Sequence, residues 1–229
     1  MIGKTNEWHL PLWLMSLDLR KAFDRIQFGP LFAALREQGV PEGYIHLLGL
    51  LYKDQKGTVN GSAFFDILRG VKQGDVISSM LFNAGLETAF RSWKLRLGCH
   101  GFLLKEHTQR LTNTRYADDV MLYAKSAEEI TEMTELLVEE LSKVGLQLNG
   151  TKTKILTTSP VEFDFVDIAG DMVEIVSHSN SHKYLGRYLP GDLLQRSHTE
   201  IGHRIQSAWC KFGKYVRVLM NKIFQSNFD

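Results

Sequence analysis

The feature that most constrains this chain is a pair of adjacent aspartates, Asp118 and Asp119, set between apolar strand-like runs. Leu111 leads into the pair and Val120–Ala124 leads out, so the pattern predicts a β-hairpin whose turn carries both carboxylates. Two adjacent negative charges repel each other, and the repulsion grows where strands exclude water. A divalent cation such as Mg²⁺, which favours carboxylate oxygens, would offset the charge. Alone, however, such a pair is more often a surface turn.

A third aspartate, Asp18, ends the apolar run Leu12–Leu17 far upstream. If that run is a strand beside the hairpin, three carboxylates converge and can hold two metal ions. Two metals can activate an attacking hydroxyl and stabilise a leaving oxygen, as phosphoryl transfer requires. Asp24 has a plainer interpretation, as a residue near a helix N-terminus or as a local ion-pair partner.

Helical and strand-like segments alternate along the chain, with turn residues between them. Helices are predicted at Leu31–Gln38, from Pro41 to about Asp54, at Ile77–Leu97, from Ser126 (an N-cap paired with Glu129) to Gly145, and from Asp192 to Lys222. Strands are predicted at Pro11–Asp18, Leu146–Leu148, Lys154–Thr158, Phe163–Ile168, Val173–Val176 and Tyr184–Leu189, with a further hairpin on Asn60-Gly61. Hairpins recurring among helices predict an α+β fold with a largely antiparallel sheet.

The composition is that of a soluble globular domain, with 44% hydrophobic and 23% charged residues. A net charge of +1 is small for a protein that grips phosphates. Residues 125–181 hold eleven acidic and four basic side chains, mostly on a helix face expected to be solvated. The end from residue 187 is basic, and it can face phosphates or be an ordinary solvated helix.

The two cysteines, Cys99 and Cys210, lack the spacing of a disulfide framework or a zinc site. Their scarcity favours a reducing, intracellular setting, without distinguishing nucleus from cytoplasm. The apolar run His9–Leu17 is too short to span a bilayer, so no membrane association is expected.

Five motifs, in order, resemble those of reverse transcriptases, and most closely those of non-LTR retrotransposons. They are Ser16–Ile26, Arg69–Asp75 with Ser78 and Leu81–Asn83, Tyr116–Asp119 (YADD), Gly145–Asn149 with Lys152–Lys154, and His182–Gly186. The segment with Ile201, Arg204, Ile205, Ala208 and Phe212 is similar to the start of a thumb. The resemblance implies a polymerase palm over residues 1–190, with its antiparallel sheet packed on helices, and the start of a helical thumb over residues 191–229.

The resemblance also implies catalytic residues and a cofactor. Asp18, Asp118 and Asp119 would bind two Mg²⁺ ions, which Mn²⁺ can replace. Lys152 would be catalytic beside the leaving pyrophosphate, as a proton donor or a point charge. Taken alone, Lys152 would be a surface lysine.

Substrate-binding residues follow from the same resemblance. They would be Phe23, Gln73, Gly74 and Tyr116, with the Phe23 ring as a steric gate beneath the incoming sugar. Tyr184, Leu185 and Gly186 would form the primer grip. The partners would be an RNA template, a DNA primer and deoxynucleoside triphosphates. Without the other motifs, Phe23 would be interpreted as an ordinary core residue, and Gln73-Gly74 as a turn.

The implied activity is that of an RNA-directed DNA polymerase, a nucleotidyltransferase. Ser78 lacks the usual flanking prolines, and Asp75 adds a negative charge near the nucleotide path. Because Asp18 follows Met1 closely, the family's fingers are expected to be missing and the thumb to be truncated. This chain alone is therefore expected to be inactive, and the alternative is an inactive retroelement remnant that binds nucleic acid weakly.

Two lesser expectations concern the surface. The acidic helix Ser126–Gly145 could serve an interaction module, although no residue pattern specifically supports it. A palm without fingers is expected to expose apolar side chains around Leu10–Leu14 and on the helix Pro41–Tyr52, and so to associate.

Overall fold

The computed structural model describes residues 7, 10–61, 63–105, 109–177, 179–193 and 196–219. The chain divides into two compact units, which are described separately. The sheet unit is Leu10–Ile175, and the hairpin–helix unit comprises Val176–Asp229 with Met1–His9. Among the described residues, none of the helices has the length and apolar character needed to cross a membrane. The palm–thumb boundary at residue 190 stays a prediction.

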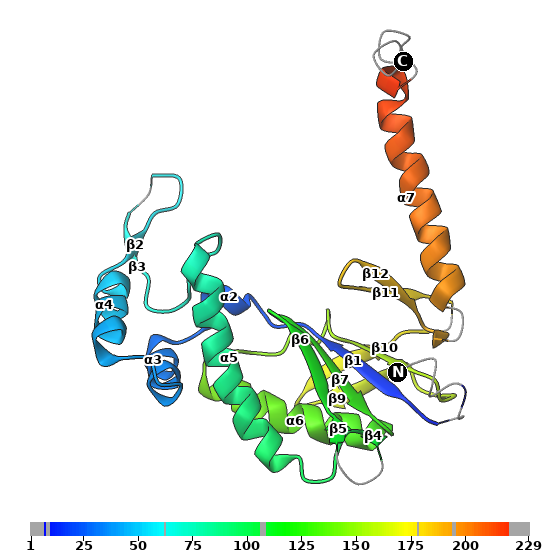
Figure 1. Cartoon of the computed structure of the whole chain (residues 1–229), viewed down its shortest axis with the longest axis horizontal. Coiled ribbons are helices and arrows are strands. Elements are labelled where there is room, and N and C mark those ends of the chain that lie inside the picture. The colour runs from blue at the N-terminus through cyan, green and yellow to red at the C-terminus, as the bar shows by residue number, and fades with distance from the viewer. Residues whose placement is uncertain are drawn as a thin grey trace. The chain divides into compact units, whose positions relative to one another are not determined.

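The sheet unit is built on six strands in the order β6-β7-β1-β8-β10-β9 (Figure 1). Their bounds are β1 (Trp13–Leu17), β6 (Asn113–Tyr116), β7 (Asp119–Ala124), β8 (Lys154–Thr157), β9 (Phe165–Ile168) and β10 (Asp171–Ile175). Only the pairing of β8 with β10 is parallel. All five residues of β1 are buried, as expected for an apolar strand with a neighbour on each side. The predicted α+β fold with a mostly antiparallel sheet is confirmed.

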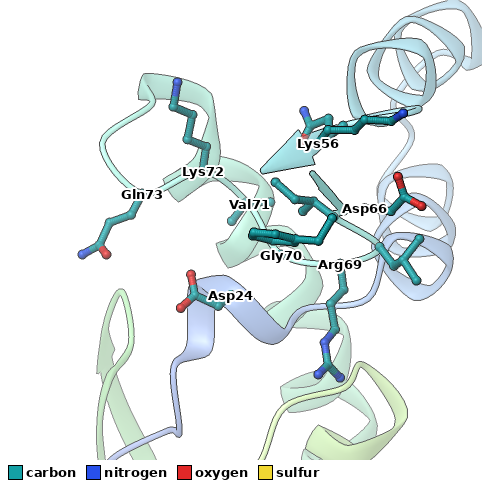
Figure 2. Close-up of a pocket in the computed structure, with 12 residues that line it drawn as sticks. Asp24, Lys56, Asp66, Arg69, Gly70, Val71, Lys72 and Gln73 are labelled. Carbon is teal, nitrogen blue, oxygen red and sulfur yellow. The ribbon is translucent and has the colours of Figure 1, made fainter. Parts of the chain in front are cut away.

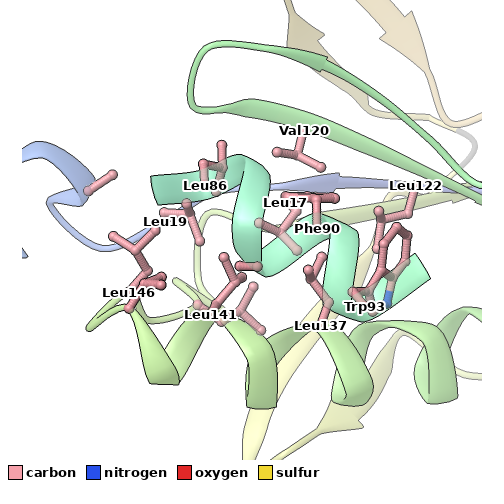
Figure 3. Close-up of a cluster of buried hydrophobic side chains, with 14 of the residues drawn as sticks. Leu17, Leu19, Leu86, Phe90, Trp93, Val120, Leu122, Leu137, Leu141 and Leu146 are labelled. Atoms are coloured by element: carbon pink, nitrogen blue, oxygen red, sulfur yellow. The ribbon is translucent and has the colours of Figure 1, made fainter. Parts of the chain in front are cut away.

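Two long helices, α5 (Val76–Arg96) and α6 (Ala127–Lys143), pack against each other, and α6 also packs on the sheet. Figure 3 shows side chains of both helices meeting Leu17 and Val120 of the strands. Trp93 of α5 is fully buried, and its indole N–H donates a 2.7 Å hydrogen bond to the carbonyl of Met133. The core therefore lies between the sheet and this helix pair.

The stretch between β1 and α5 forms short elements: α2 (Ala22–Arg25), α3 (Phe28–Glu37), α4 (Glu42–Tyr52), β2 (Lys56–Gly57) and β3 (Phe65–Asp66). The predicted hairpin is present, and both residues of its expected turn, Asn60 and Gly61, have positive φ. Apolar exposure on α4 is confirmed at Tyr44, Leu47, Leu50 and Leu51. The exposure predicted around Leu10–Leu14 is wrong for Leu12 and Leu14, which are buried at the start of the central strand.

Helix α6 begins and ends as its sequence predicts. The Ser126 hydroxyl accepts a 3.2 Å hydrogen bond from the Glu129 N–H, which stabilises the first turn. The Glu129 carboxylate returns to the N–H of Lys125, one residue before the cap. Gly145 follows the helix with φ +84°, where a Cβ would lie 2.8 Å from the Arg25 carbonyl oxygen, so only glycine fits.

Three sequence predictions were wrong in detail. Leu146–Leu148 forms no strand and contributes one isolated bridge, between Leu148 and Leu19. The hairpin of β4 (Phe102–Lys105) and β5 (Gln109–Leu111) was missed. The run of polar residues from Lys105 to Arg110 interrupts the alternation of apolar and polar residues that predicts a strand. Tyr184–Leu189 is not one strand, since Leu185 and Gly186 have positive φ and turn the chain back on itself.

The hairpin–helix unit contains β11 (Ser181–Tyr184), β12 (Arg187–Pro190) and α7 (Arg196–Leu219). The Tyr188 ring stacks on His203 with centroids 3.7 Å apart, and the Tyr188 N–H donates to Glu200 at 3.0 Å. These contacts join the hairpin to the helix. The helix predicted over Asp192–Lys222 is confirmed from Arg196 to Leu219, whereas Asp192 lies in a bend and Lys222 lies outside the described residues.

Glu140 of α6 predicts a pH dependence of stability. This side chain is 3% exposed and accepts hydrogen bonds from Lys143 at 2.6 Å and Arg96 at 2.7 Å. Burial raises its pKa, but the hydrogen bonds from Lys143 and Arg96 outweigh burial, so the pKa lies below the ordinary 4.5. A carboxylate whose pKa is lowered by folding stabilises the fold above its unfolded pKa, and this stabilisation is lost as pH falls through the folded pKa.

Glu140→Gln is therefore expected to lower the free energy of unfolding at neutral pH by on the order of 1–2 kcal/mol. The difference from the unsubstituted chain should shrink as pH falls below 4.5. Urea unfolding at several pH values measures both effects. A constant difference across that acidic range would contradict the assignment.

Candidate active site

A pocket of about 690 Å³ opens where β1 ends, and four separate stretches of the chain line it. Five predicted site residues line this carboxylate pocket: Asp18, Phe23, Gln73, Asp118 and Lys152. The remaining lining residues are Leu19, Arg20, Lys21, Ala22, Asp24, Arg25, Asn149 and Thr151. The fold thus gathers residues that are widely spaced in the sequence.

The register of the sheet explains why the aspartates meet. Leu17 pairs with Val120, so Asp18 and Asp119 lie at the same end of neighbouring strands. Tyr116 pairs with Asp119, which leaves Ala117 and Asp118 as a two-residue turn. Ala117 has φ +54°, in a region that non-glycine residues adopt only where a turn requires it. The predicted hairpin is confirmed.

The three carboxylates affect one another electrostatically. The pKa of Asp119 is raised, first by partial burial and then by the negative charges of Asp118 and Asp18. Within the described part of the chain, however, no three His, Cys, Asp or Glu side chains form a group that could hold a metal ion. Asp18 and Asp118 therefore share the pocket, whereas Asp119, at the start of β7, is not among its lining residues. The three carboxylates are not a preformed ligand cluster. The oxygen donors and uncompensated charge still fit a divalent cation.

Phe23 is one of the residues that line the pocket. Its ring is half-buried and stacks on Phe82 of α5, with centroids 4.7 Å apart and planes 16° apart. The carbonyl of Phe23 accepts a 2.7 Å hydrogen bond from the Val71 N–H. Gly70 approaches so closely that a Cβ would lie 2.8 Å from the Asp24 carbonyl oxygen. This contact docks the Arg69–Asp75 motif on α2 and brings Gln73 to the pocket.

A second pocket, about 890 Å³, lies between this motif and the β2–β3 hairpin. Figure 2 shows Lys56, Arg69 and Lys72 among its lining residues. Asp24 and Gln73 line both pockets, so the two spaces adjoin. Gly74 lines neither pocket. Asp75, which is the N-cap residue of α5, also lines neither pocket.

The pattern of motifs agrees with comparisons to known proteins. The family model described as "Reverse transcriptase (RNA-dependent DNA polymerase)" matches residues 4–189. The chain belongs to the reverse transcriptase family.

Its curated relatives include Pol polyproteins of R2 non-LTR retrotransposons. The chain is 30% identical over 145 residues to the Pol polyprotein of the retrotransposable element R2DM from Drosophila melanogaster, covering 61% of this chain and 13% of that protein. It is 28% identical over 164 residues to the R2 Pol polyprotein of Bradysia coprophila, covering 70% of this chain and 18% of that one. This reverse transcriptase chain thus spans under a fifth of the length of these relatives.

The solved structures most relevant to the fold are telomerases. The structure of Candida tropicalis telomerase with the TWJ fragment of telomeric RNA matches at 16% identity and a TM-score of 0.57. The match covers 84% of this chain and 30% of that one. Apo telomerase of the same species, truncated from its C-terminal domain, gives a TM-score of 0.55 at 16% identity, over 84% of this chain and 36% of that one. At this identity the likeness supports the reverse transcriptase fold alone.

The remaining predicted residues lie elsewhere. Tyr116 is 71% exposed on β6 and is not among the lining residues of the carboxylate pocket. Leu185 and Gly186 form the turn of the β11–β12 hairpin and Tyr184 precedes it, all in the hairpin–helix unit. Their proposed roles rest on the motif.

Sequence reasoning missed two residues that hold the reverse transcriptase motifs in place. Arg115, just before the YADD motif, forms an ion pair with Glu87 of α5 and stacks 4.4 Å over the Phe90 ring. Asn149 donates a hydrogen bond to Asp18. Both residues stood within or beside a motif, but only the folded chain shows their partners.

Proposed function

We propose that this chain is the catalytic palm of an RNA-directed DNA polymerase that uses Mg²⁺ to add deoxynucleotides to a primer 3′-hydroxyl. The observation that carries the proposal is the pocket shared by Asp18, Phe23, Gln73, Asp118 and Lys152. Family membership supports the reaction class, and the raised pKa of Asp119 supports a site that favours added positive charge.

Asp18 and Asp118 are the proposed ligands of two Mg²⁺ ions, with Asp119 as a supporting carboxylate. Bound metal supplies charge neutralisation for the attacking hydroxyl and the leaving pyrophosphate. Mn²⁺ has the same oxygen preference and is the proposed substitute. Lys152, in the same pocket, is the proposed partner of the leaving phosphates, either as a proton donor or as a point charge.

The remaining roles concern substrate and partners. Phe23 is held by its stack on Phe82, so a rigid ring would meet the incoming sugar and exclude a 2′-hydroxyl. Gln73 and Gly74 are proposed to border the nucleotide and the RNA template. Tyr184, Leu185 and Gly186 are proposed to support the DNA primer. Cys99 and Cys210 are both free and exposed, which supports the proposed intracellular setting.

The test is primer extension by the purified chain. The sequence alone predicts that the chain is inactive. Because the fold brings Asp18 and Asp118 into one pocket, we expect instead that a DNA primer on an RNA template, with deoxynucleoside triphosphates and Mg²⁺, is extended by the chain but not by its Asp118→Ala variant. Loss of extension without metal, and a strong preference over ribonucleoside triphosphates, complete the expected pattern. Extension equal to that of Asp118→Ala at every metal concentration would reject activity of this chain and favour the inactive remnant.

A further inference from the structure

Asn149 makes a set of contacts at the end of β1. Its side-chain Nδ2 donates a 2.8 Å hydrogen bond to Oδ1 of Asp18. Its backbone N–H donates to the Asp18 carbonyl at 2.9 Å, and the neighbouring Leu148 bridges to Leu19. The Gly145–Asn149 motif is therefore attached to the strand end that carries the proposed metal ligand.

The Asn149 amide is held at both ends, and the Asp18 carboxylate sets its orientation. The Asp18 carboxylate accepts hydrogen bonds and has none to donate when ionised, so the amide must present its NH₂ group there. The amide oxygen accepts a 2.9 Å hydrogen bond from the Thr151 hydroxyl. A flipped side chain would turn its oxygen toward the Asp18 carboxylate and lose that bond. The Thr151 hydroxyl, which can donate or accept, anchors the other end of the amide.

The two oxygens of Asp18 are thereby made unequal. Oδ1 is held by Asn149, whereas Oδ2 accepts no hydrogen bond from any residue that the structure describes. The Asp18 backbone is fixed as well, since its N–H donates at 3.1 Å to the hydroxyl of the buried Thr153. One oxygen is fixed and the other remains available to the pocket.

We propose that Asn149, oriented by Thr151, is a positioning residue that holds the Asp18 carboxylate ready to bind metal. The inference rests on the proposed function, because it assigns Asp18 as a metal ligand. Groups that hydrogen-bond to metal ligands restrict the ligand's rotamers, and their loss commonly costs 10–100-fold in metal affinity. The hydrogen bond from Asn149 would restrict the rotamers of the Asp18 carboxylate in the same way.

A purely structural role for Asn149 would reside in its backbone. The Asn149 carbonyl accepts hydrogen bonds from the N–H groups of Lys152 and Thr153 and shapes the turn. Alanine at this position keeps those bonds and removes only the side-chain contacts. The two roles are thus separable by substitution.

The experiment measures Mn²⁺ binding to the full chain by electron paramagnetic resonance, together with the thermal midpoint in the absence of metal. Asn149→Ala is expected to weaken Mn²⁺ binding by about tenfold or more. Thr151→Val should weaken it less, and the double variant should bind no more weakly than Asn149→Ala, because the hydroxyl acts through the amide.

Asn113→Ala is the matched control. The Asn113 amide also accepts a hydrogen bond from a threonine, Thr112 at 3.1 Å, but it is not bonded to an aspartate. Its Mn²⁺ affinity should equal that of the unsubstituted chain. Circular dichroism of each variant verifies the fold, and the exposed Thr151 gives a variant that is expected to fold normally.

Two adverse outcomes have different meanings. Mn²⁺ binding by the unsubstituted chain that Asn149→Ala leaves within twofold would overturn the positioning role and leave the proposed function intact. Absence of Mn²⁺ binding by the unsubstituted chain would contradict the proposed metal chemistry, and the positioning role with it. A loss in the double variant equal to the product of the two single losses would show that Thr151 acts independently of Asn149.

Discussion

Asp18→Asn is expected to reduce Mg²⁺-dependent primer extension by about a thousandfold or more while making the protein more resistant to heat. A metal-bound carboxylate contributes several kcal/mol of charge stabilisation in the transition state, and each 1.36 kcal/mol is about tenfold in rate. The same charge destabilises the fold without metal, because Asp18 is one cause of the raised pKa of Asp119. Activity and stability should therefore change in opposite directions.

Primer extension and thermal unfolding without metal measure the two effects. Asp54→Asn is the control for charge, since Asp54 lies outside both pockets and has φ +54°, which asparagine also adopts. It should change neither quantity measurably. Asparagine at position 18 can still accept the hydrogen bond from Asn149 through its amide oxygen. A fall in the thermal midpoint would therefore show that the charge on this hydrogen bond stabilises the fold by more than the repulsion among the carboxylates destabilises it.

Trp93→Ala is expected to destabilise the sheet unit by about 3–5 kcal/mol, the range for truncating a fully buried large aromatic side chain. Trp93 is fully buried, and its loss would leave a cavity beside Phe90 and remove the indole hydrogen bond to the carbonyl of Met133. For a chain of this size the loss corresponds to roughly 6–20 °C in the midpoint of thermal unfolding. Urea unfolding followed by circular dichroism gives the free energy directly.

Two exposed residues provide controls for this truncation. Leu95 lies on the same helix but is 88% exposed, and Trp209 on α7 is 68% exposed. Alanine at either position should change the free energy of unfolding by no more than about 0.5 kcal/mol. A Trp93→Ala variant as stable as these two would mean that the interface between α5 and α6 is not the centre of the core.

Much of the carboxylate pocket could be predicted because its key residues end recognisable strands and turns. The apolar run before Asp18 indicates a buried strand, and the apolar flanks of Asp118 and Asp119 indicate a hairpin. The register that joins them follows from burying both apolar runs against the same helices. The helix from Ser126 to Gly145 was equally predictable, because hydroxyl caps and terminal glycines are local signals.

The remaining features depend on contacts that no local pattern records. The bond from Asn149 to Asp18 joins positions far apart in the sequence, and the polar Asn149 gives no sign of its partner. The turn at Leu185 was missed because an apolar residue with positive φ is rare, so the segment resembled a continuous strand. The sequence assigned no role to Arg115, whose partners Glu87 and Phe90 are brought to it only by the fold.

The position of β1 between two partners has a consequence for how this reverse transcriptase chain can vary. The strand pairs with β7 on one edge and with β8 on the other. Side chains alternate between faces, so one inserted or deleted residue would turn half of the strand inside out and break both ladders together. The same slip would carry Asp18 away from the hairpin turn. Length changes can accumulate in peripheral loops, whereas the spacing within Trp13–Asp18 is fixed by two neighbouring strands and by the place of Asp18 in the carboxylate pocket.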